Sequence, residues 1–490
     1  MNHLDGMSRR TEIALLGAVL VLAAVLRFAG LGSESLWLDE GYSVRVASGS
    51  LREVIAGATG DIHPPLYYLL LHLWMAFAGR SEVAVRSLSA LAGLVTVALT
   101  WALGRRILDA RAGLLAALLV ALSGFQLQYS QEARSYALLA MLAALSLGFA
   151  VRALEKGRAR DLAGMTLASI ALVYTHHAGW FVIAAQAITP LGASRFRGAG
   201  SGRAWSAWAL AHALVVAAWW PWLGVVRAQA ATLGTLAWLP RTGPKALAGA
   251  LIEQADSPWL ALVILGLAAT ALLRARRPPA AVPRTGVSVG IVAIWLALPI
   301  LVPFLLSWAG RPFFLARITI AAGVPLALLA AAGIVALPRV AQAGVVGVLA
   351  LLAVPPFAAY EAGPHRERWR EAVAALERDA RPGDRVLFDA GFCLRDVWGY
   401  YARRRDLELR PVPATADSAA LAAALAGGAR ARRVWLVRSH DGDAGEEMAR
   451  GLALGHRRTL ERRYESITYE LWRPRRYLGV RVERFERPDE

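Results

Sequence analysis

The chain has 490 residues, of which 57% are hydrophobic and only 18% are charged. Long runs of Ala, Leu and Val exclude an ordinary soluble enzyme, because the domains of such a protein need polar surfaces. The net charge of +18 comes from basic residues scattered between apolar runs, so we expect no nucleic-acid partner. The single cysteine, Cys393, excludes an intrachain disulfide framework and a cysteine-based zinc site. We therefore predict a multispanning protein whose partners include membrane lipids.

Apolar stretches long enough for bilayer-spanning helices recur over the first three quarters of the chain. We predict about eleven spans, near 13–31, 85–104, 112–128, 134–151, 162–176, 178–192, 205–222, 258–273, 287–308, 318–337 and 340–358. Another apolar stretch, 64–79, would cover roughly 22 Å as a helix, short of a hydrocarbon core of about 30 Å. We interpret it as an external juxtamembrane or re-entrant helix. A short true span is the alternative, and it would invert all later topology.

Arginines collect at the start of the chain and in every second loop, which indicates that these segments are cytoplasmic. The remaining loops and the C-terminal region are then external. From about residue 360, charged residues become frequent and helical runs alternate with short β-rich runs, which is typical of an α/β domain. We predict helices at 366–380, 396–404, 418–426 and 446–454, and strands at 385–389, 407–412, 433–439, 468–473 and 478–482. The predicted domains are a transmembrane catalytic domain, 1–358, and an extracytoplasmic α/β domain, 359–490.

The first external loop carries the motif Ser35-Leu36-Trp37-Leu38-Asp39-Glu40-Gly41-Tyr42. Asp39 follows an apolar triplet, which places a carboxylate at the border between bilayer and water. Such a carboxylate can take a proton from an incoming hydroxyl as a general base. The alternative is that Asp39 or Glu40 only caps a juxtamembrane helix.

Arginines also stand at the external ends of predicted spans. Arg86 begins the second span, Arg134 lies in the motif Tyr129–Tyr136 with Glu132, and Arg317 precedes the tenth span. One such arginine usually reaches toward lipid headgroups, but several together can hold a lipid phosphate by charge-assisted hydrogen bonds. Acids and cations at one face indicate glycosyl transfer from a lipid-phosphate donor.

Four motifs resemble those of bacterial glycosyltransferase family 39 proteins, which have the GT-C fold and are related to protein O-mannosyltransferases and to the aminoarabinose transferase of lipid A. The motifs are Leu36–Ser43, His63–Tyr68, Tyr129–Tyr136 and Tyr174–His177. The similarity covers most of residues 10–350, and the tail that begins at Trp369 resembles the extracytoplasmic domain of some bacterial members.

This resemblance implies an inverting transfer of one sugar from a polyprenyl-phosphate donor to a glycan, lipid or protein acceptor, with hexoses and pentoses both allowed. It implies a bacterial plasma (inner) membrane location with the active site on the external, periplasmic side. The expected catalytic residues are Asp39 as the base, Glu40 and Glu132. The expected donor-phosphate ligands are His63, Arg86, Arg134 and Arg317, and the expected substrate-lining residues are Tyr42, Asp61, Tyr67, Tyr129 and His176.

Two positions depart from the relatives. His63 stands where aminoarabinose transferases have a lysine, and its charge depends on pH. Ile318 replaces the tyrosine that usually follows the arginine at position 317.

Two alternatives stay open. A divalent metal could be bound in the first loop by Asp39, Glu40, Asp61 and His63, as acids do in oligosaccharyltransferases. The closer relatives suggest a transfer without metal or other cofactor. A transporter or flippase of lipid-linked sugars is the other alternative. Transporters place ionisable residues near the bilayer midplane and often contain repeats. Most candidate residues of this sequence lie at external span ends instead, and no repeat is visible, although His212 and Gln186 fall within predicted spans.

Overall fold

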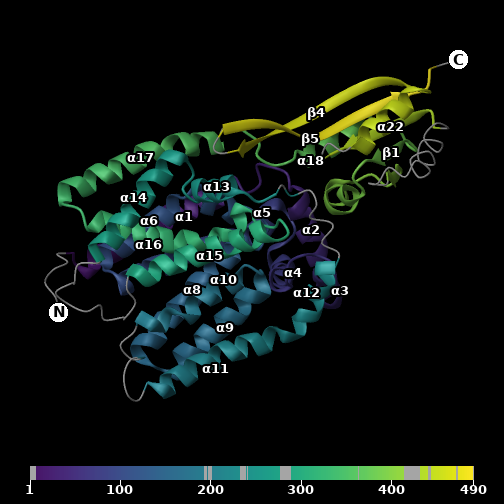
Figure 1. Cartoon of the computed structure of the whole chain (residues 1–490). Helices are drawn as coiled ribbons and strands as arrows, with labels where there is room; N and C mark the ends of the chain where they lie inside the picture. The colour runs from purple at the N-terminus through teal and green to yellow at the C-terminus, as the bar shows by residue number, and fades with distance from the viewer. Residues whose placement is uncertain are drawn as a thin grey trace. The chain divides into compact units, whose positions relative to one another are not determined.

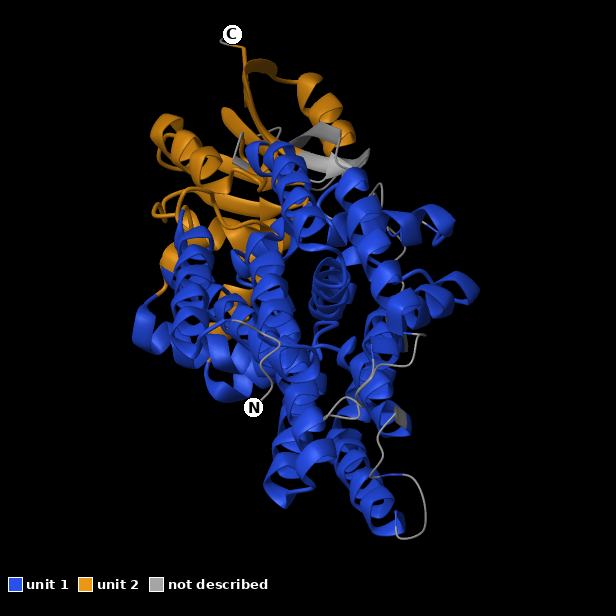
Figure 2. Ribbon diagram, turned by 90° about the vertical axis from the view of Figure 1, so that its left-hand side faces the viewer, with its two compact units in different colours: residues 1–29, 50–79, 84–358 blue, residues 30–49, 80–83, 359–490 orange. Residues whose placement is uncertain are grey.

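The computed structural model describes residues 7–192, 196, 201–231, 239, 241–275, 289–361, 363–412, 431–439, 443–470 and 473–488. They belong to two compact units, coloured blue and orange in Figure 2. The first unit is Met1–Ala29, Ser50–Gly79 and Ala84–Ala358, and the second is Gly30–Gly49, Arg80–Val83 and Ala359–Glu490. The division between the two units therefore falls near the predicted domain boundary at 358/359, but the second unit also includes Gly30–Gly49 and Arg80–Val83.

The first unit is helical, and Figure 1 labels most of its elements. Its α-helices are α1 (Arg9–Phe28), α3 (Leu51–Thr59), α4 (Leu66–Ala78), α5 (Glu82–Ile107, of which Glu82 and Val83 belong to the second unit), α6 (Ala110–Leu122), α7 (Gly124–Ser130), α8 (Tyr136–Lys156), α9 (Ala159–Thr175), α10 (Gly179–Ala187), α11 (Gly202–Trp219), α12 (Leu223–Ala231), α13 (Pro244–Gln254), α14 (Pro258–Ala275), α15 (Val289–Ala309), α16 (Gly323–Val335) and α17 (Arg339–Glu361, whose end belongs to the second unit). Short 3₁₀ turns, η1 (Thr189–Gly192), η3 (Trp220–Trp222) and η5 (Ala316–Ala322), extend three of these helices.

All eleven stretches predicted as spans are helical in the structure. Within the described residues, eight helices are long and apolar enough to cross a membrane, and the pair α6–α7, bent by 61°, is a ninth candidate. The stretch predicted at 162–176 forms α9, which has 17 residues, and the stretch predicted at 178–192 forms α10, which has 9 residues and is followed by η1. The apolar stretch 64–79 forms α4, whose 13 residues are too few for a full span.

Small residues let the helices of the first unit approach closely. A Cβ atom at Gly333 of α16 would lie 2.1 Å from the carbonyl oxygen of Leu267 in α14. A Cβ at Gly104 of α5 would lie 2.7 Å from Gly113 Cα at the start of α6. Van der Waals contact between close backbones is a main source of helix association in lipid, where apolar surface gains little from leaving the solvent.

The second unit contains a five-stranded sheet of strand order β2-β1-β3-β5-β4. The strands are β1 (Arg385–Phe388), β2 (Glu408–Pro411), β3 (Arg433–Arg438), β4 (Arg457–Glu470) and β5 (Arg473–Glu486). β1 pairs in parallel with β2 and β3, whereas β5 is antiparallel to β3 and β4. The helical elements of this unit are α2 (Leu38–Ala47), α18 (Trp369–Asp379), α19 (Gly391–Cys393), η6 (Leu394–Trp398), α20 (Gly399–Tyr401) and α22 (Asp443–Ala453).

Apolar residues alternate between the two faces of this sheet, as strand geometry requires. Val386 and Trp435 pack in a cluster with Trp369 of α18, while Leu436 packs with Met448 of α22. This helix–sheet–helix layering confirms the small α/β domain. The strands predicted at 468–473 and 478–482 are parts of the longer β4 and β5. The helix predicted at 396–404 is replaced by the short turns η6 and α20, and the helix predicted at 418–426 lies outside the described residues.

Candidate active site

His63 stands at the centre of a polar cluster in the first unit, just before Pro64-Pro65 and α4. Its Nδ1 lies 3.0 Å from Asp61 Oδ2, and the Tyr68 hydroxyl donates to the same carboxylate oxygen at 2.5 Å. Burial raises the pKa of Asp61, but the charges of His63 and Arg134 and the hydrogen bonds from His63 and Tyr68 outweigh it and hold this pKa well below its usual range. Asp61 is therefore a carboxylate at neutral pH.

Arg134 joins this cluster from the segment between α7 and α8. One of its terminal nitrogens lies 3.5 Å from His63 Nδ1, and both side chains are buried. The backbone N–H of Arg134 donates to the carbonyl of Glu132 at 2.8 Å, which makes a tight turn. Glu132 is also buried. The structure thus places Arg134 and His63, both predicted phosphate ligands, side by side.

Aromatic rings line the same region. The ring of His63 lies 5.1 Å from that of His176, and Tyr136 lies 5.7 Å from His176 and 5.0 Å from Tyr129 between ring centres. The guanidinium of Arg317 sits over the Tyr136 ring at 5.7 Å, within the range of a cation–π contact. Residues from four separate parts of the sequence therefore meet in one cationic and aromatic cluster.

The helix α7, which presents Tyr129, is fixed at its N-terminus by a residue far along the chain. The carboxylate of Asp256 accepts hydrogen bonds from the backbone N–H groups of Gly124 at 2.8 Å and Phe125 at 2.6 Å. Asp256 itself has a positive φ of 67° between α13 and α14. This capping satisfies two of the backbone donors that a helix start leaves unpaired.

Glu253, at the end of α13, is a residue of this region that the sequence analysis missed. It interacts electrostatically with both Arg317 and Tyr129. Burial raises the pKa of Glu253 to about 7, and Arg317 only partly opposes this shift. Its one sequence signal is that it is an acid just before the apolar stretch 258–273. The sequence analysis also did not predict that Tyr68, Tyr136 and Gln229 would line the site. The side-chain amide of Gln229 donates to the backbone carbonyl of Asp61.

Two further predicted residues, Tyr67 and Arg86, also belong to the first unit. Tyr67 shares a hydrogen bond of 3.3 Å with Ser89, whose hydroxyl donates to the carbonyl of Arg134 at 3.2 Å. Arg86 of α5 is completely buried. Its predicted contact with a donor phosphate stays a prediction.

Asp39, Glu40 and Tyr42 belong to the second unit, on α2. The backbone N–H of Trp37 donates to Glu40 Oε2 at 3.3 Å, and Arg366 Nε lies 3.8 Å from the same oxygen. Glu40 is completely buried, whereas Asp39 at the same helix start is half-buried. Glu40 thus anchors the N-terminus of α2, and Asp39 is the acid of this pair that retains exposed surface.

Further along α2, Arg45 joins the helix to the sheet domain. Its Nε lies 2.5 Å from Asp396 Oδ1 in η6, and its guanidinium lies 5.0 Å from the centre of the Tyr42 ring. A Cβ atom at Gly41 would lie 2.6 Å from the carbonyl oxygen of Asp396. Any other residue at position 41 would push α2 away from η6, so the glycine of the motif fixes the helix that carries Asp39.

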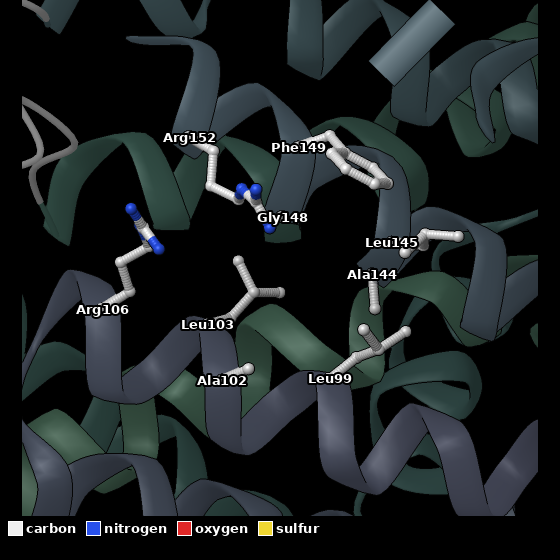
Figure 3. Close-up of a pocket in the computed structure, with 9 residues that line it drawn as sticks. All are labelled: Leu99, Ala102, Leu103, Arg106, Ala144, Leu145, Gly148, Phe149 and Arg152. Atoms are coloured by element: carbon white, nitrogen blue, oxygen red, sulfur yellow. The ribbon is translucent and has the colours of Figure 1, made fainter. Parts of the chain in front are cut away.

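Neither a metal cluster nor the cavity in Figure 3 adds to this site. Among the described residues, no group of three or more His, Cys, Asp or Glu side chains could hold a metal ion. The cavity of about 150 Å³ in Figure 3 lies between α5 and α8 and is apolar except for Arg106 and Arg152 at one end. None of the predicted site residues lines it.

Comparison with known proteins places this arrangement in a known fold. The chain is similar to the structure of ArnT from Cupriavidus metallidurans bound to undecaprenyl phosphate, with a TM-score of 0.59 and 15% identity over 97% of this chain and 98% of that one. The chain has the GT-C fold. The apo form of the same ArnT gives a TM-score of 0.58 at 15% identity over 96% of this chain and 97% of that one.

Two further comparisons agree with the GT-C fold. Archaeal oligosaccharyltransferase AglB from Archaeoglobus fulgidus, in complex with an inhibitory peptide and a dolichol-phosphate, gives a TM-score of 0.50 at 13% identity over 87% of this chain and 69% of that one. A sequence profile of the family described as dolichyl-phosphate-mannose-protein mannosyltransferase matches residues 62–224, which include His63 and Arg134. No curated protein sequence matches the chain.

Proposed function

We propose that this GT-C protein is a membrane glycosyltransferase that moves one sugar from a polyprenyl phosphate to an acceptor hydroxyl. The observation that carries the proposal is the cluster of His63, Arg134 and Arg317 in a chain that shares its fold with ArnT over nearly its full length. ArnT has been solved with undecaprenyl phosphate bound. Three cationic or protonatable side chains beside aromatic rings are suited to a lipid phosphate.

In this mechanism, Asp39 takes the proton from the acceptor hydroxyl while the hydroxyl oxygen attacks the anomeric carbon of the sugar. The bond between that carbon and the phosphate oxygen breaks, and the electron pair leaves on the phosphate. Arg134, Arg317 and protonated His63 neutralise the departing charge. Because the oxygen enters opposite to the phosphate in one displacement, the configuration at the anomeric carbon inverts.

The other acids have supporting roles in this proposal. Glu132, in the turn that carries Arg134, orients the acceptor or the sugar. Glu40 holds the start of α2 and thereby the position of Asp39. Asp61 keeps His63 beside Arg134. Tyr129 and His176 line the substrate, and the reaction takes place on the external side of a bacterial plasma membrane.

The proposal is tested with purified protein in detergent, given undecaprenyl-phosphate sugars together with the glycans, lipids and proteins that can act as acceptors, all extracted from the membranes in which it is expressed. We expect free undecaprenyl phosphate and a glycosylated product, measured by mass spectrometry. Sugars that stay lipid-linked in detergent, but cross the bilayer of sealed vesicles containing the protein, would contradict it and indicate a transporter instead.

We propose that the transfer needs no metal. A strong chelator should leave the rate of product formation unchanged. Loss of the rate, with recovery on adding Mg²⁺ or Mn²⁺, would contradict this part of the proposal alone.

A further inference from the structure

A large cavity lies within the second unit. It has a volume of about 1160 Å³ and is walled by α2, α18, η6, α20 and the segments beside them. The residues that line it include seven arginines and three acids. We call it the arginine groove, after Arg45, Arg80, Arg370, Arg378, Arg395, Arg403 and Arg404.

The three acids of the groove are already engaged within the unit. Asp396 is held by Arg45 at 2.5 Å, and Glu82 lies 3.3 Å from Arg370. Glu377 Oε1 accepts hydrogen bonds from two backbone N–H groups, at 2.8 and 2.9 Å. These acids therefore neutralise part of the wall and leave an excess of positive charge.

That excess is concentrated on four side chains. Arg80, Arg378, Arg395 and Arg403 are exposed. In the part of the chain that the structure describes, the guanidinium groups of these four arginines make no salt bridge and no hydrogen bond. A concave wall with several such guanidinium groups concentrates positive potential and attracts anions. Each fork of N–H donors matches the two oxygens of a phosphate or a carboxylate.

The groove shares a helix with the proposed general base. Gly41 and Arg45 of α2 line it, and Asp39 lies in the first turn of the same helix. Asp39 also interacts electrostatically with Asp396 in the groove wall. Tyr400 adds a half-buried aromatic ring to the lining, which suits the apolar face of a sugar ring.

We propose that the arginine groove binds the acceptor through phosphate or carboxylate groups that the acceptor carries on its glycan. Calling the ligand an acceptor rests on the proposed function, but anion binding in the groove does not. An acceptor held there by its charged groups would bring its hydroxyl to the helix that carries Asp39. The substrate class that follows is an anionic glycan, not a neutral one.

The test is equilibrium binding of fluorescein-labelled disaccharides to the full-length protein in detergent, without donor. Three probes are compared: one with two phosphate monoesters, one with two carboxylates, and one neutral. Stronger binding of either anionic probe supports the proposal and identifies which of the two groups is recognised. Equal binding of all three probes would overturn it.

A matched pair of double variants locates the binding. Arg395→Gln with Arg403→Gln removes two groove charges, and we expect about tenfold weaker binding of the preferred anionic probe. Arg405→Gln with Arg457→Gln removes two exposed charges outside the groove lining and should change binding by less than about twofold. Equal losses in the two variants would overturn the groove as the site, because they would show only a general effect of net charge.

The same measurement separates this inference from the mechanism. Asp39→Asn should still bind the preferred probe with unchanged affinity, since the binding is carried by the arginines. Loss of sugar transfer with intact probe binding is the expected result. Intact transfer of a sugar to neutral acceptors, without probe binding, would overturn the groove and leave the glycosyltransferase proposal standing.

Discussion

Replacing Arg317 is expected to weaken the binding of undecaprenyl phosphate strongly. Its guanidinium lies over the ring of Tyr136, next to the cluster around His63, and it interacts electrostatically with Glu253. A hydrogen bond to a charged group contributes about 1.5–3 kcal/mol, so Arg317→Gln should raise the dissociation constant about 10- to 150-fold. Arg317→Lys should lose part of this affinity, because an ammonium keeps the charge without the planar fork of donors.

The assay is binding of undecaprenyl phosphate to purified protein in detergent, followed by native mass spectrometry at several lipid concentrations. Arg311→Gln is the matched control, because Arg311 is exposed in the connection between α15 and η5, the turn that contains Arg317. The control should bind within about twofold of the wild type. A folded Arg317→Gln protein with wild-type affinity would refute the placement of the phosphate at this arginine.

Three other variants test charge and packing in the two units. Burial raises the pKa of Glu253 to about 7, so its carboxyl is neutral below that pH and negative above it. Because the carboxylate then competes with the phosphate for Arg317, the affinity of the wild-type protein for undecaprenyl phosphate should fall between about pH 6 and pH 8. Glu253→Gln should lose the part of this fall that the Glu253 carboxylate causes, and a pH profile identical to that of the wild type would contradict the competition. Gly333→Ala should destabilise the protein by about 1–3 kcal/mol, because the added Cβ meets the backbone of α14. The control Gly266→Ala, at an open position of α14, should leave the stability unchanged. Equal melting temperatures of the two variants would show that α14 and α16 can move apart without a cost in stability. Glu40→Ala removes a buried acceptor at the start of α2 and should lower stability by about 1–3 kcal/mol, so an unchanged melting temperature would contradict its anchoring role.

The helices of the first unit were predictable because the signal for a span is local. Each of the eleven stretches predicted as a span is helical, since hydrophobic length along the sequence reports burial in lipid directly. The apolar stretch 64–79 was expected to be too short for a full span, and α4 has only 13 residues. The length of α10 was overestimated, because apolar residues continue past Ala187, where this helix ends.

The candidate site was predictable as a set of motifs, but not as an arrangement. The residues His63, Arg134 and Arg317 were found because each lies in an unusual external segment, and the structure brings them together. Glu253 was missed because its relation to Arg317 depends on the packing of α13 beside η5, which no local pattern indicates. The capping of α7 by Asp256 is equally a contact between distant segments.

The second unit shows the same limit. Gly30–Gly49 joins the C-terminal domain through pairs such as Arg45 with Asp396, 351 positions apart in the sequence. Nothing in either segment alone indicates this association. The strands β4 and β5 were predicted too short because they are rich in Arg and Glu, and the usual alternation of apolar and polar residues is therefore weak over much of their length.

The central claim, that Asp39 is the general base of sugar transfer, is tested most directly by the transfer rate of Asp39→Asn. Amide replacement keeps the size of the side chain and removes its ability to accept the proton, so we expect a loss of about 10²- to 10⁴-fold in rate. Undecaprenyl phosphate affinity should stay unchanged. Glu447→Gln, which changes a carboxylate of α22 remote in sequence from the motifs, should keep the wild-type rate. Transfer by Asp39→Asn at close to the wild-type rate would contradict the claim.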